Sequence, residues 1–118
     1  MSIKTAKTAG FCYGVKRAVD EVYRLSDIEE SLATLGEIIH NEHVVNDLKQ
    51  KGVSVYSDVN DVPDGTTVVI RTHGVGKNVY DSIQKRGLKF VDLTCPFVEK
   101  IHKIVNEHHK KGYKIVII

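Results

Sequence analysis

Residues 67–93 read TVVIRTHGVGKNVYDSIQKRGLKFVDL and contain the pattern that decides the fold. The β-branched run at residues 67–70 has no polar interruption along its length, which is typical of a strand covered on both faces. A helical pattern follows and ends at Gly87, and residues 90–93 form a second strand pattern. A strand, a helix and a strand in this order predict a right-handed crossover between two parallel strands.

The same alternation extends to both ends of the chain. An amphipathic helix is expected from Val15 to Leu25, because apolar residues recur there at helical spacing with charged residues opposite. Further helices are expected through residues 44–48, through residues 79–83 and from Pro96 to Gly112. Strands are expected at residues 3–7, 32–35, 53–56, 67–70, 90–93 and 113–118. We therefore expect an α/β fold of alternating βα units with a mostly parallel sheet, in which one short edge strand could pair antiparallel.

The amino-acid composition argues against several classes of protein. The chain has 118 residues, of which 42% are hydrophobic and 27% charged, and this fits one compact domain. A net charge of +2 without long runs of like charge argues against a nucleic-acid-binding surface. Apolar runs are far shorter than the roughly 20 residues that span a bilayer, and no targeting segment is recognisable. We expect a cytoplasmic protein that binds neither nucleic acid nor membrane.

Each of four expected strand-to-helix junctions carries one cysteine or histidine: Cys12, His40, His73 and Cys95. Ligands of parallel sheets bind beyond the carboxyl ends of the strands, so this placement predicts one shared site. The ordinary alternatives are that the cysteines are small buried hydrophobic residues and that the histidines are hydrogen-bonded structural imidazoles.

The two cysteines have neither the Cys-x-x-Cys spacing of a metal finger nor the number needed for a disulfide framework. Cys95 precedes Pro96 at an expected helix start, where unpaired backbone amides favour a thiolate that acts as a metal ligand or nucleophile. Cys12 lies between Gly10 and Gly14, whose flexible backbone suits the wrapping of a bulky inorganic group.

The glycine-rich segment at residues 72–77 reads THGVGK and indicates an anion site, because its backbone amides and Lys77 precede a helix. It is not a phosphate-binding P-loop: Arg71 stands where the first glycine is required, and Asn78 stands where Ser or Thr would bind magnesium. A phosphorylated small molecule would fit this site.

Four motifs resemble one enzyme family: GFCYGVKRA at residues 10–18, IHN at 39–41, THGV at 72–75 and TCP at 94–96. In this order, and over the whole chain, they are similar to 4-hydroxy-3-methylbut-2-enyl diphosphate reductases. That family catalyses the last step of the non-mevalonate isoprenoid pathway.

The resemblance implies a three-lobed α/β enzyme around a 4Fe-4S cluster that is held by three cysteines. Cys12 and Cys95 match the first two metal ligands, and His40 and His73 match histidines that bind the substrate's diphosphate. The third cysteine, a third histidine and the glutamate proton donor of the family lie downstream and are absent from this chain.

The resemblance also implies a reaction and partners. Members of the family remove the hydroxyl group of an allylic diphosphate reductively, with electrons from a ferredoxin or flavodoxin, and form isopentenyl and dimethylallyl diphosphate. Residues 1–118 are then an amino-terminal fragment, with a first lobe at 13–95 and the start of a second lobe at 96–118. The first strand is assigned to the absent third lobe, and the fragment alone is expected to be inactive.

Two other readings remain open at the level of the sequence. One is a phosphate-ligand-binding α/β module without redox chemistry, in which both cysteines are structural. The other is a redox switch in which Cys12 and Cys95 act as a dithiol pair.

Overall fold

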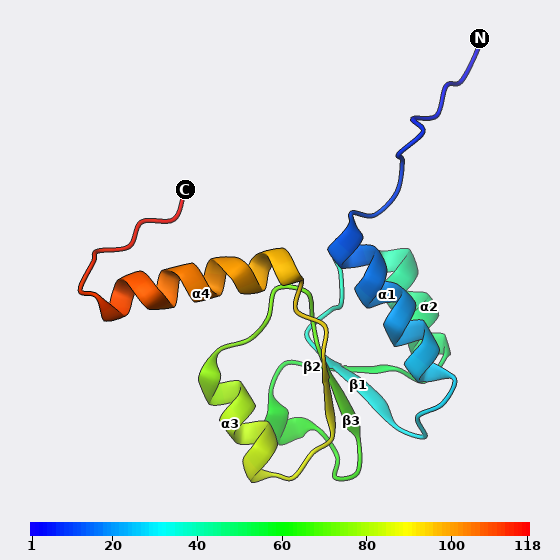
Figure 1. Cartoon of the computed structure of the whole chain (residues 1–118). Helices are drawn as coiled ribbons and strands as arrows, with labels where there is room; N and C mark the ends of the chain where they lie inside the picture. The colour runs from blue at the N-terminus through cyan, green and yellow to red at the C-terminus, as the bar shows by residue number, and fades with distance from the viewer.

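The structure is a computed structural model that describes residues 1–118, and its core is one four-stranded sheet (Figure 1). The strands are β1 (Leu32–Leu35), β2 (Ser54–Tyr56), β3 (Thr67–Ile70) and β4 (Phe90–Asp92), in the spatial order β2-β1-β3-β4. The helices are α1 (Tyr13–Ser26), α2 (Glu42–Gln50), α3 (Lys77–Lys85) and α4 (Pro96–Lys110), with a short 3-10 helix, η1 (Val59–Asp61). All strand pairs are parallel, which confirms the α/β class and excludes the antiparallel edge strand.

Side chains of the two central strands alternate between two apolar clusters, so both faces of the sheet are covered. On one face, Leu32 and Val69 belong to a cluster with residues of α1 and α2, which lie side by side in Figure 1. On the other face, Leu35 and Val68 belong to a cluster with residues of η1 and α3. Every residue of β1 and β3 is buried, as the sequence predicts for the central strand.

Local sequence explains where the helices begin and which side they bury. α1 buries the stripe that includes Ala18, Val22 and Leu25, and its charged residues face solvent. α2 begins after Asn41, whose Oδ1 accepts a hydrogen bond of 3.2 Å from the amide of Val44. These helices and the four strands are confirmed to within about two residues at each end.

Two predicted strands are wrong. Residues 3–7 and 113–118 form no strand, and most of their side chains are exposed. Their β-branched residues meet the local preference for a strand, but neither segment has a neighbouring strand to pair with. The sheet ends at β2 on one side and at β4 on the other.

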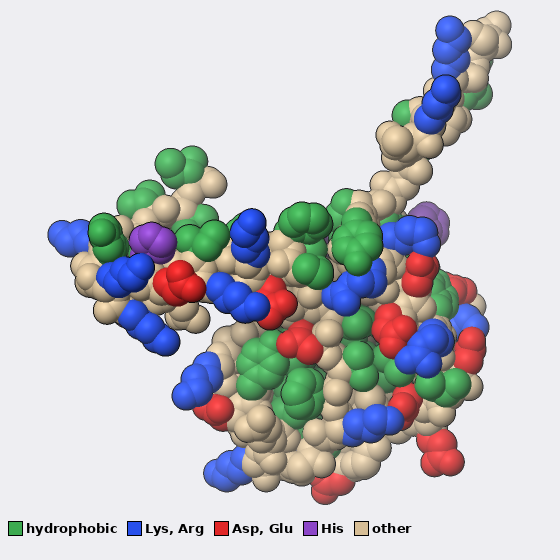
Figure 2. All heavy atoms as spheres, viewed as in Figure 1, with side chains coloured by type: hydrophobic (Ala, Val, Ile, Leu, Met, Phe, Trp, Pro, Cys, Tyr) green, Lys and Arg blue, Asp and Glu red, His purple; other side chains and the backbone are tan.

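Helix α4 differs from the other helices because it buries none of its residues. It leads away from the sheet in Figure 1, and hydrophobic side chains gather along it in Figure 2. Phe97, Ile101 and Ile104 are 68%, 52% and 47% exposed. No helix of the structure is both long enough and apolar enough to cross a membrane.

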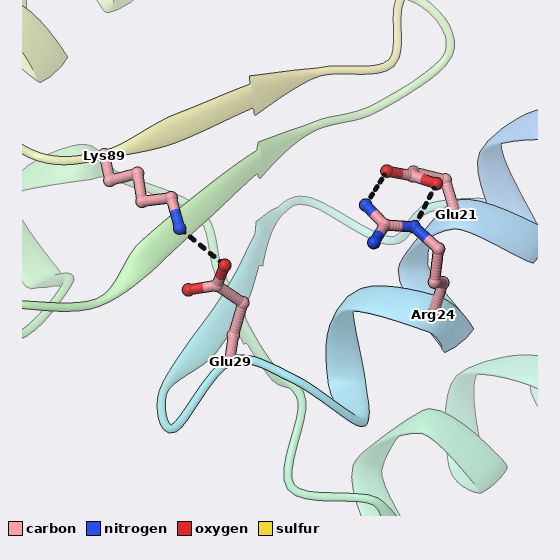
Figure 3. A network of polar contacts seen from close by, with 4 residues as sticks. All are labelled: Glu21, Arg24, Glu29 and Lys89. Carbon is pink, nitrogen blue, oxygen red and sulfur yellow. Dashed lines mark hydrogen bonds and ion pairs between the residues drawn. The ribbon is translucent and has the colours of Figure 1, made fainter.

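Glu29, in the link between α1 and β1, joins the amino-terminal ends of three strands (Figure 3). Its carboxylate accepts hydrogen bonds from Lys89 Nζ at 2.6 Å and from Thr67 Oγ1 at 2.8 Å. Lys89 precedes β4 and Thr67 begins β3. The hydrogen bond from Lys89, followed by the one from Thr67, holds the pKa of Glu29 below its usual value.

We expect the substitution Glu29→Gln to lower the midpoint of urea unfolding at neutral pH, because the neutral amide loses the charge-assisted bond to Lys89. A lowered carboxyl pKa stabilises the fold above the pKa of the unfolded chain, near 4.3, and this contribution is lost as the pH falls through the lowered pKa. The difference between the two proteins should therefore shrink below about pH 4. The neighbouring Glu30→Gln is the control, and an equal effect of both substitutions would contradict this role.

Candidate functional site

The connection after β1 leads to β2 on one side of the sheet, and the connection after β3 leads to β4 on the other side. The carboxyl ends of β1 and β3 therefore lie where the strand order changes direction. Ligands of open α/β sheets bind at such a point. His40 lies in the loop after β1 and His73 in the loop after β3. Their ring centroids are 6.2 Å apart and the ring planes are tilted by 42°. The structure therefore brings the two predicted histidines together.

Both imidazoles are exposed to solvent at this edge. The carboxylate Oε2 of Glu37 lies 3.7 Å from Nδ1 of His40, which is an ion-pair distance if the ring is protonated. Glu37 and His40 are both largely exposed, so their contact leaves the rings accessible to a ligand.

The two loops that carry the histidines also touch at a second point. Gly36 has a φ angle of +72°, and a Cβ atom at this position would lie 2.7 Å from Nη1 of Arg71. The guanidinium of Arg71 therefore packs directly against the backbone at the end of β1. Sequence reasoning treated Arg71 only as a departure from the P-loop pattern and missed this contact.

Cys95 is held beside the His73 loop by backbone pairing that continues past the ends of the strands. The amide of Leu93 donates to Ile70 O at 2.9 Å, and the amide of Cys95 donates to Thr72 O at 2.9 Å. His73 is the next residue after Thr72. The parallel register of β3 and β4 thus places one predicted cysteine next to one predicted histidine.

Each cysteine occupies the N-cap position of a helix, Cys12 before α1 and Cys95 before α4. Neither thiol makes a capping hydrogen bond, and both are free. The amino-terminal amides of a helix present partial positive charge, which suits a negatively charged sulfur or ligand at both positions.

Gly14 brings the start of α1 into contact with Cys95. A Cβ atom at Gly14 would collide with Cys95 Sγ and would lie 3.0 Å from Cys95 Cβ. Gly14 is buried in the first turn of α1, two residues after Cys12. The structure therefore places the helix that begins at one cysteine against the side chain of the other.

The glycine-rich loop after β3 approaches α4 in the same way. Gly74 has a φ angle of +73°, and a Cβ atom there would lie 3.2 Å from Thr94 Oγ1 and 3.1 Å from His102 Cε1. Sequence analysis assigned no role to His102, and only the fold shows it beside this loop.

Two further residues that sequence analysis did not assign hold the segment before Cys95. Arg17 Nη2 donates to Thr94 O at 3.0 Å, and Asp92 Oδ1 accepts from the Thr94 amide at 2.9 Å. Burial opposes the charge of Asp92, but hydrogen bonds from Thr94 and Tyr80 outweigh it, so that its pKa is lowered. The sequence feature that could have indicated Arg17 is its position one helical turn after Gly14, on the same face of α1.

The four predicted residues do not enclose a cavity or a complete metal site. No group of three or more Cys, His, Asp or Glu side chains is close enough to hold a metal ion. A cavity of about 450 Å³ lies next to the site, between Gly36, Arg71 and the residues of η1 and α3, and none of the four lines it. The chain thus presents an open edge with two thiols and two imidazoles.

The contact between Gly14 and Cys95 gives a testable prediction. We expect Gly14→Ala to lower the free energy of unfolding by about 1–3 kcal/mol, because the new methyl group overlaps the sulfur of Cys95. The same substitution in a Cys95→Ala background should cost clearly less, since the sulfur is gone. Urea unfolding of the two single variants and the double variant measures the coupling, and strictly additive effects would contradict the contact.

The chain is similar in sequence to the proteins of one family. The family described as LytB protein matches residues 3–118. The 4-hydroxy-3-methylbut-2-enyl diphosphate reductase of Thermoanaerobacter sp. (strain X514) is 45% identical over 124 residues, which cover 100% of this chain and 42% of the relative. The enzyme of the same name from Clostridioides difficile (strain 630) is 42% identical over 119 residues, which cover 100% of this chain and 43% of the relative.

Two solved structures share the fold. The E-1-hydroxy-2-methyl-but-2-enyl-4-diphosphate reductase of Plasmodium falciparum superimposes with a TM-score of 0.83 at 32% identity, covering 91% of this chain and 34% of that chain. A structure of (E)-4-hydroxy-3-methyl-but-2-enyl diphosphate reductase, described as the terminal enzyme of the non-mevalonate pathway, gives a TM-score of 0.78 at 41% identity, covering 92% of this chain and 38% of that chain. The chain spans less than half the length of these relatives. Since the family match extends over almost all of its residues, the chain belongs to the LytB protein family.

Proposed function

We propose that this chain is the amino-terminal part of a 4-hydroxy-3-methylbut-2-enyl diphosphate reductase. The proposal rests on relatives of that name that align with the full chain. The structural observation that supports it best is the grouping of its thiols and imidazoles at one edge of the sheet. His40 lies beside His73, and the Cys95 side chain lies against the first turn of the helix that begins after Cys12.

In this proposal Cys12 and Cys95 are two of the three cysteine ligands of a 4Fe-4S cluster, and the third comes from a part of the protein outside this chain. The residues fit this role, because neither cysteine is in a disulfide and neither thiol makes a capping hydrogen bond. Both thiols lie at helix N-termini. No group of three Cys, His, Asp or Glu side chains within this chain could hold a metal ion by itself, so the proposal takes the remaining ligand from another segment. When bound, the cluster supplies a Lewis-acidic iron and a route for single electrons.

The overall reaction removes a hydroxyl group from an allylic diphosphate. A carbon–oxygen bond breaks and a carbon–hydrogen bond forms, so two electrons and two protons are consumed and one water is released for each isopentenyl or dimethylallyl diphosphate. The electrons come from a ferredoxin or flavodoxin. This chain contributes no proton donor of its own in the proposal, and we expect residues 1–118 alone to be inactive.

His40 and His73 bind the diphosphate group. Their rings are 6.2 Å apart, which allows each to donate a hydrogen bond to a different oxygen of one diphosphate. The backbone of the glycine-rich loop after His73 adds amide donors next to the same edge. The exposed position of both rings agrees with a ligand that approaches from solvent.

The proposed division into lobes has support from the packing. Neither apolar cluster contains a residue beyond Leu93, and α4 buries no residue. We therefore assign residues 13–95 to a first lobe and residues 96–118 to the start of a second lobe. Free thiols and thiolate-bound iron need a reducing compartment, so the proposal includes a cytoplasmic location.

The cysteine ligands are tested in the full-length protein that contains this chain. We expect Cys12→Ser and Cys95→Ser each to lower iron content and to abolish reduction of the substrate, because a hydroxyl group replaces a thiolate poorly at iron. Iron and sulfide analysis, visible absorption and turnover after anaerobic reconstitution measure this. A colourless wild-type protein that still binds diphosphate would favour the non-redox module, and reversible loss of two thiols without iron would favour the redox switch.

The histidines should affect binding without affecting the cluster. We expect His40→Asn and His73→Asn each to weaken diphosphate binding by about 10-fold or more, since each loses a hydrogen bond to a charged oxygen. Visible absorption should be unchanged, and His109→Asn, at the exposed end of α4, is the control. Unchanged affinity and turnover in both variants would return these residues to a structural role.

A further inference from the structure

The position of the Cys95 sulfur depends on a segment at the margin of the packed core. Leu93 is buried in the first apolar cluster, whereas α4, which starts directly after Cys95, buries nothing. Thr94 is the single residue between this last core residue and the thiol. The contacts of Thr94 therefore fix the direction in which the chain leaves the sheet at Cys95.

Arg17 holds Thr94 from the side of α1. Its Nη2 donates a hydrogen bond of 3.0 Å to the carbonyl oxygen of Thr94 in a partly buried position, and its Nε is buried without a hydrogen-bond partner. Arg17 lies one helical turn after Gly14, which contacts Cys95 Sγ. One face of α1 therefore touches both Thr94 and Cys95 and connects them with Cys12 at the start of the same helix.

Asp92, the last residue of β4, also hydrogen-bonds to Thr94. Its Oδ1 accepts hydrogen bonds from the Thr94 amide at 2.9 Å and from Thr94 Oγ1 at 2.5 Å. Its Oδ2 accepts a hydrogen bond of 2.6 Å from the hydroxyl of Tyr80 in α3. The amide, the hydroxyl and the carbonyl of Thr94 are thus all bonded, two of them to Asp92 and the third to Arg17.

We propose that Arg17 and Asp92 are positioning residues that fix Cys95 relative to Cys12, so that the two sulfurs can ligate one cluster. This inference rests on the proposed function. Bonds to both peptide groups of Thr94 prevent the residue from rotating, and a rotation would swing the Cys95 side chain away from Gly14. Residues behind metal ligands commonly affect metal retention even though they do not touch the metal.

A purely structural role is the competing explanation, and Arg24 provides a matched comparison. Arg24 lies two turns after Arg17 on α1 and is 59% exposed (Figure 3). It hydrogen-bonds only to Glu21 of the same helix, at 2.9 and 2.6 Å. Its replacement removes an arginine and its hydrogen bonds from α1 without touching Thr94.

The test uses the reconstituted full-length protein and its variants Arg17→Met, Arg17→Lys, Asp92→Ala and Arg24→Met. The primary measurement is the rate at which an iron chelator removes iron, followed by the loss of visible absorption. We expect Arg17→Met and Asp92→Ala to accelerate iron loss by about 10- to 100-fold. Arg17→Lys should retain part of the effect of arginine, and Arg24→Met should behave as wild type.

Urea unfolding of the metal-free variants separates positioning from stability. The inference requires that Arg17→Met and Asp92→Ala release iron much faster than their shifts in the unfolding midpoint explain. It also requires that Arg17→Lys releases iron more slowly than Arg17→Met. The inference is overturned if the rate of iron release is unchanged in Arg17→Met and Asp92→Ala. It is also overturned if the change in the urea-unfolding midpoint fully accounts for the change in that rate. Should Arg17→Met fail to fold, the comparison between Asp92→Ala and Arg24→Met decides, and equal rates of iron release in these two variants overturn the inference. Full iron content in Cys95→Ser would instead overturn the proposed function.

Discussion

The parallel pairing of β3 with β4 is the interaction on which the site depends. Val68, Val69 and Ile70 are fully buried, so β3 is fixed by apolar contacts on both faces of the sheet. Its register with β4 continues beyond the strands, through the bond from the Cys95 amide to Thr72 O. One ladder therefore sets His73 and Cys95 side by side, and a shift of the register by one residue would separate them and turn the side chains to opposite faces.

Close contact between backbone segments sets the rest of the site geometry. Such contact requires glycine at particular positions. Gly14 allows the first turn of α1 to touch the sulfur of Cys95, and Gly74 allows the loop after β3 to touch Thr94. A side chain at either glycine would push apart the elements that carry the proposed ligands. The glycines that sequence analysis treated as flexible points are therefore, in part, points of contact between elements distant in the sequence.

Sequence patterns predicted the central fold well because they report on burial along each element. The stripe of α1 and the apolar run of β3 are buried as expected, and β1 is fully buried as well. The same patterns failed at residues 3–7 and 113–118, since a β-branched run forms a strand only where a partner strand is available. The sequence also identified His40, His73 and Cys95 at strand-to-helix junctions. The role of Arg17 was missed because its bond to Thr94 joins positions 77 residues apart. Asp92 bonds to a residue only two positions away, but nothing in the sequence pattern marks that bond.

The contrast between α4 and the rest of the chain explains why the Thr94 contacts matter. Local features account for α4, among them Pro96 in its first turn and an ion pair of 3.3 Å between Lys103 and Glu99. Its exposed Phe97 and Ile101 give it no packing against the sheet. A helix that buries none of its residues does not by itself fix the direction of its first residue. The orientation of the Cys95 thiol is therefore set from the sheet side, by the Thr72 ladder bond and by the bonds of Arg17 and Asp92 to Thr94.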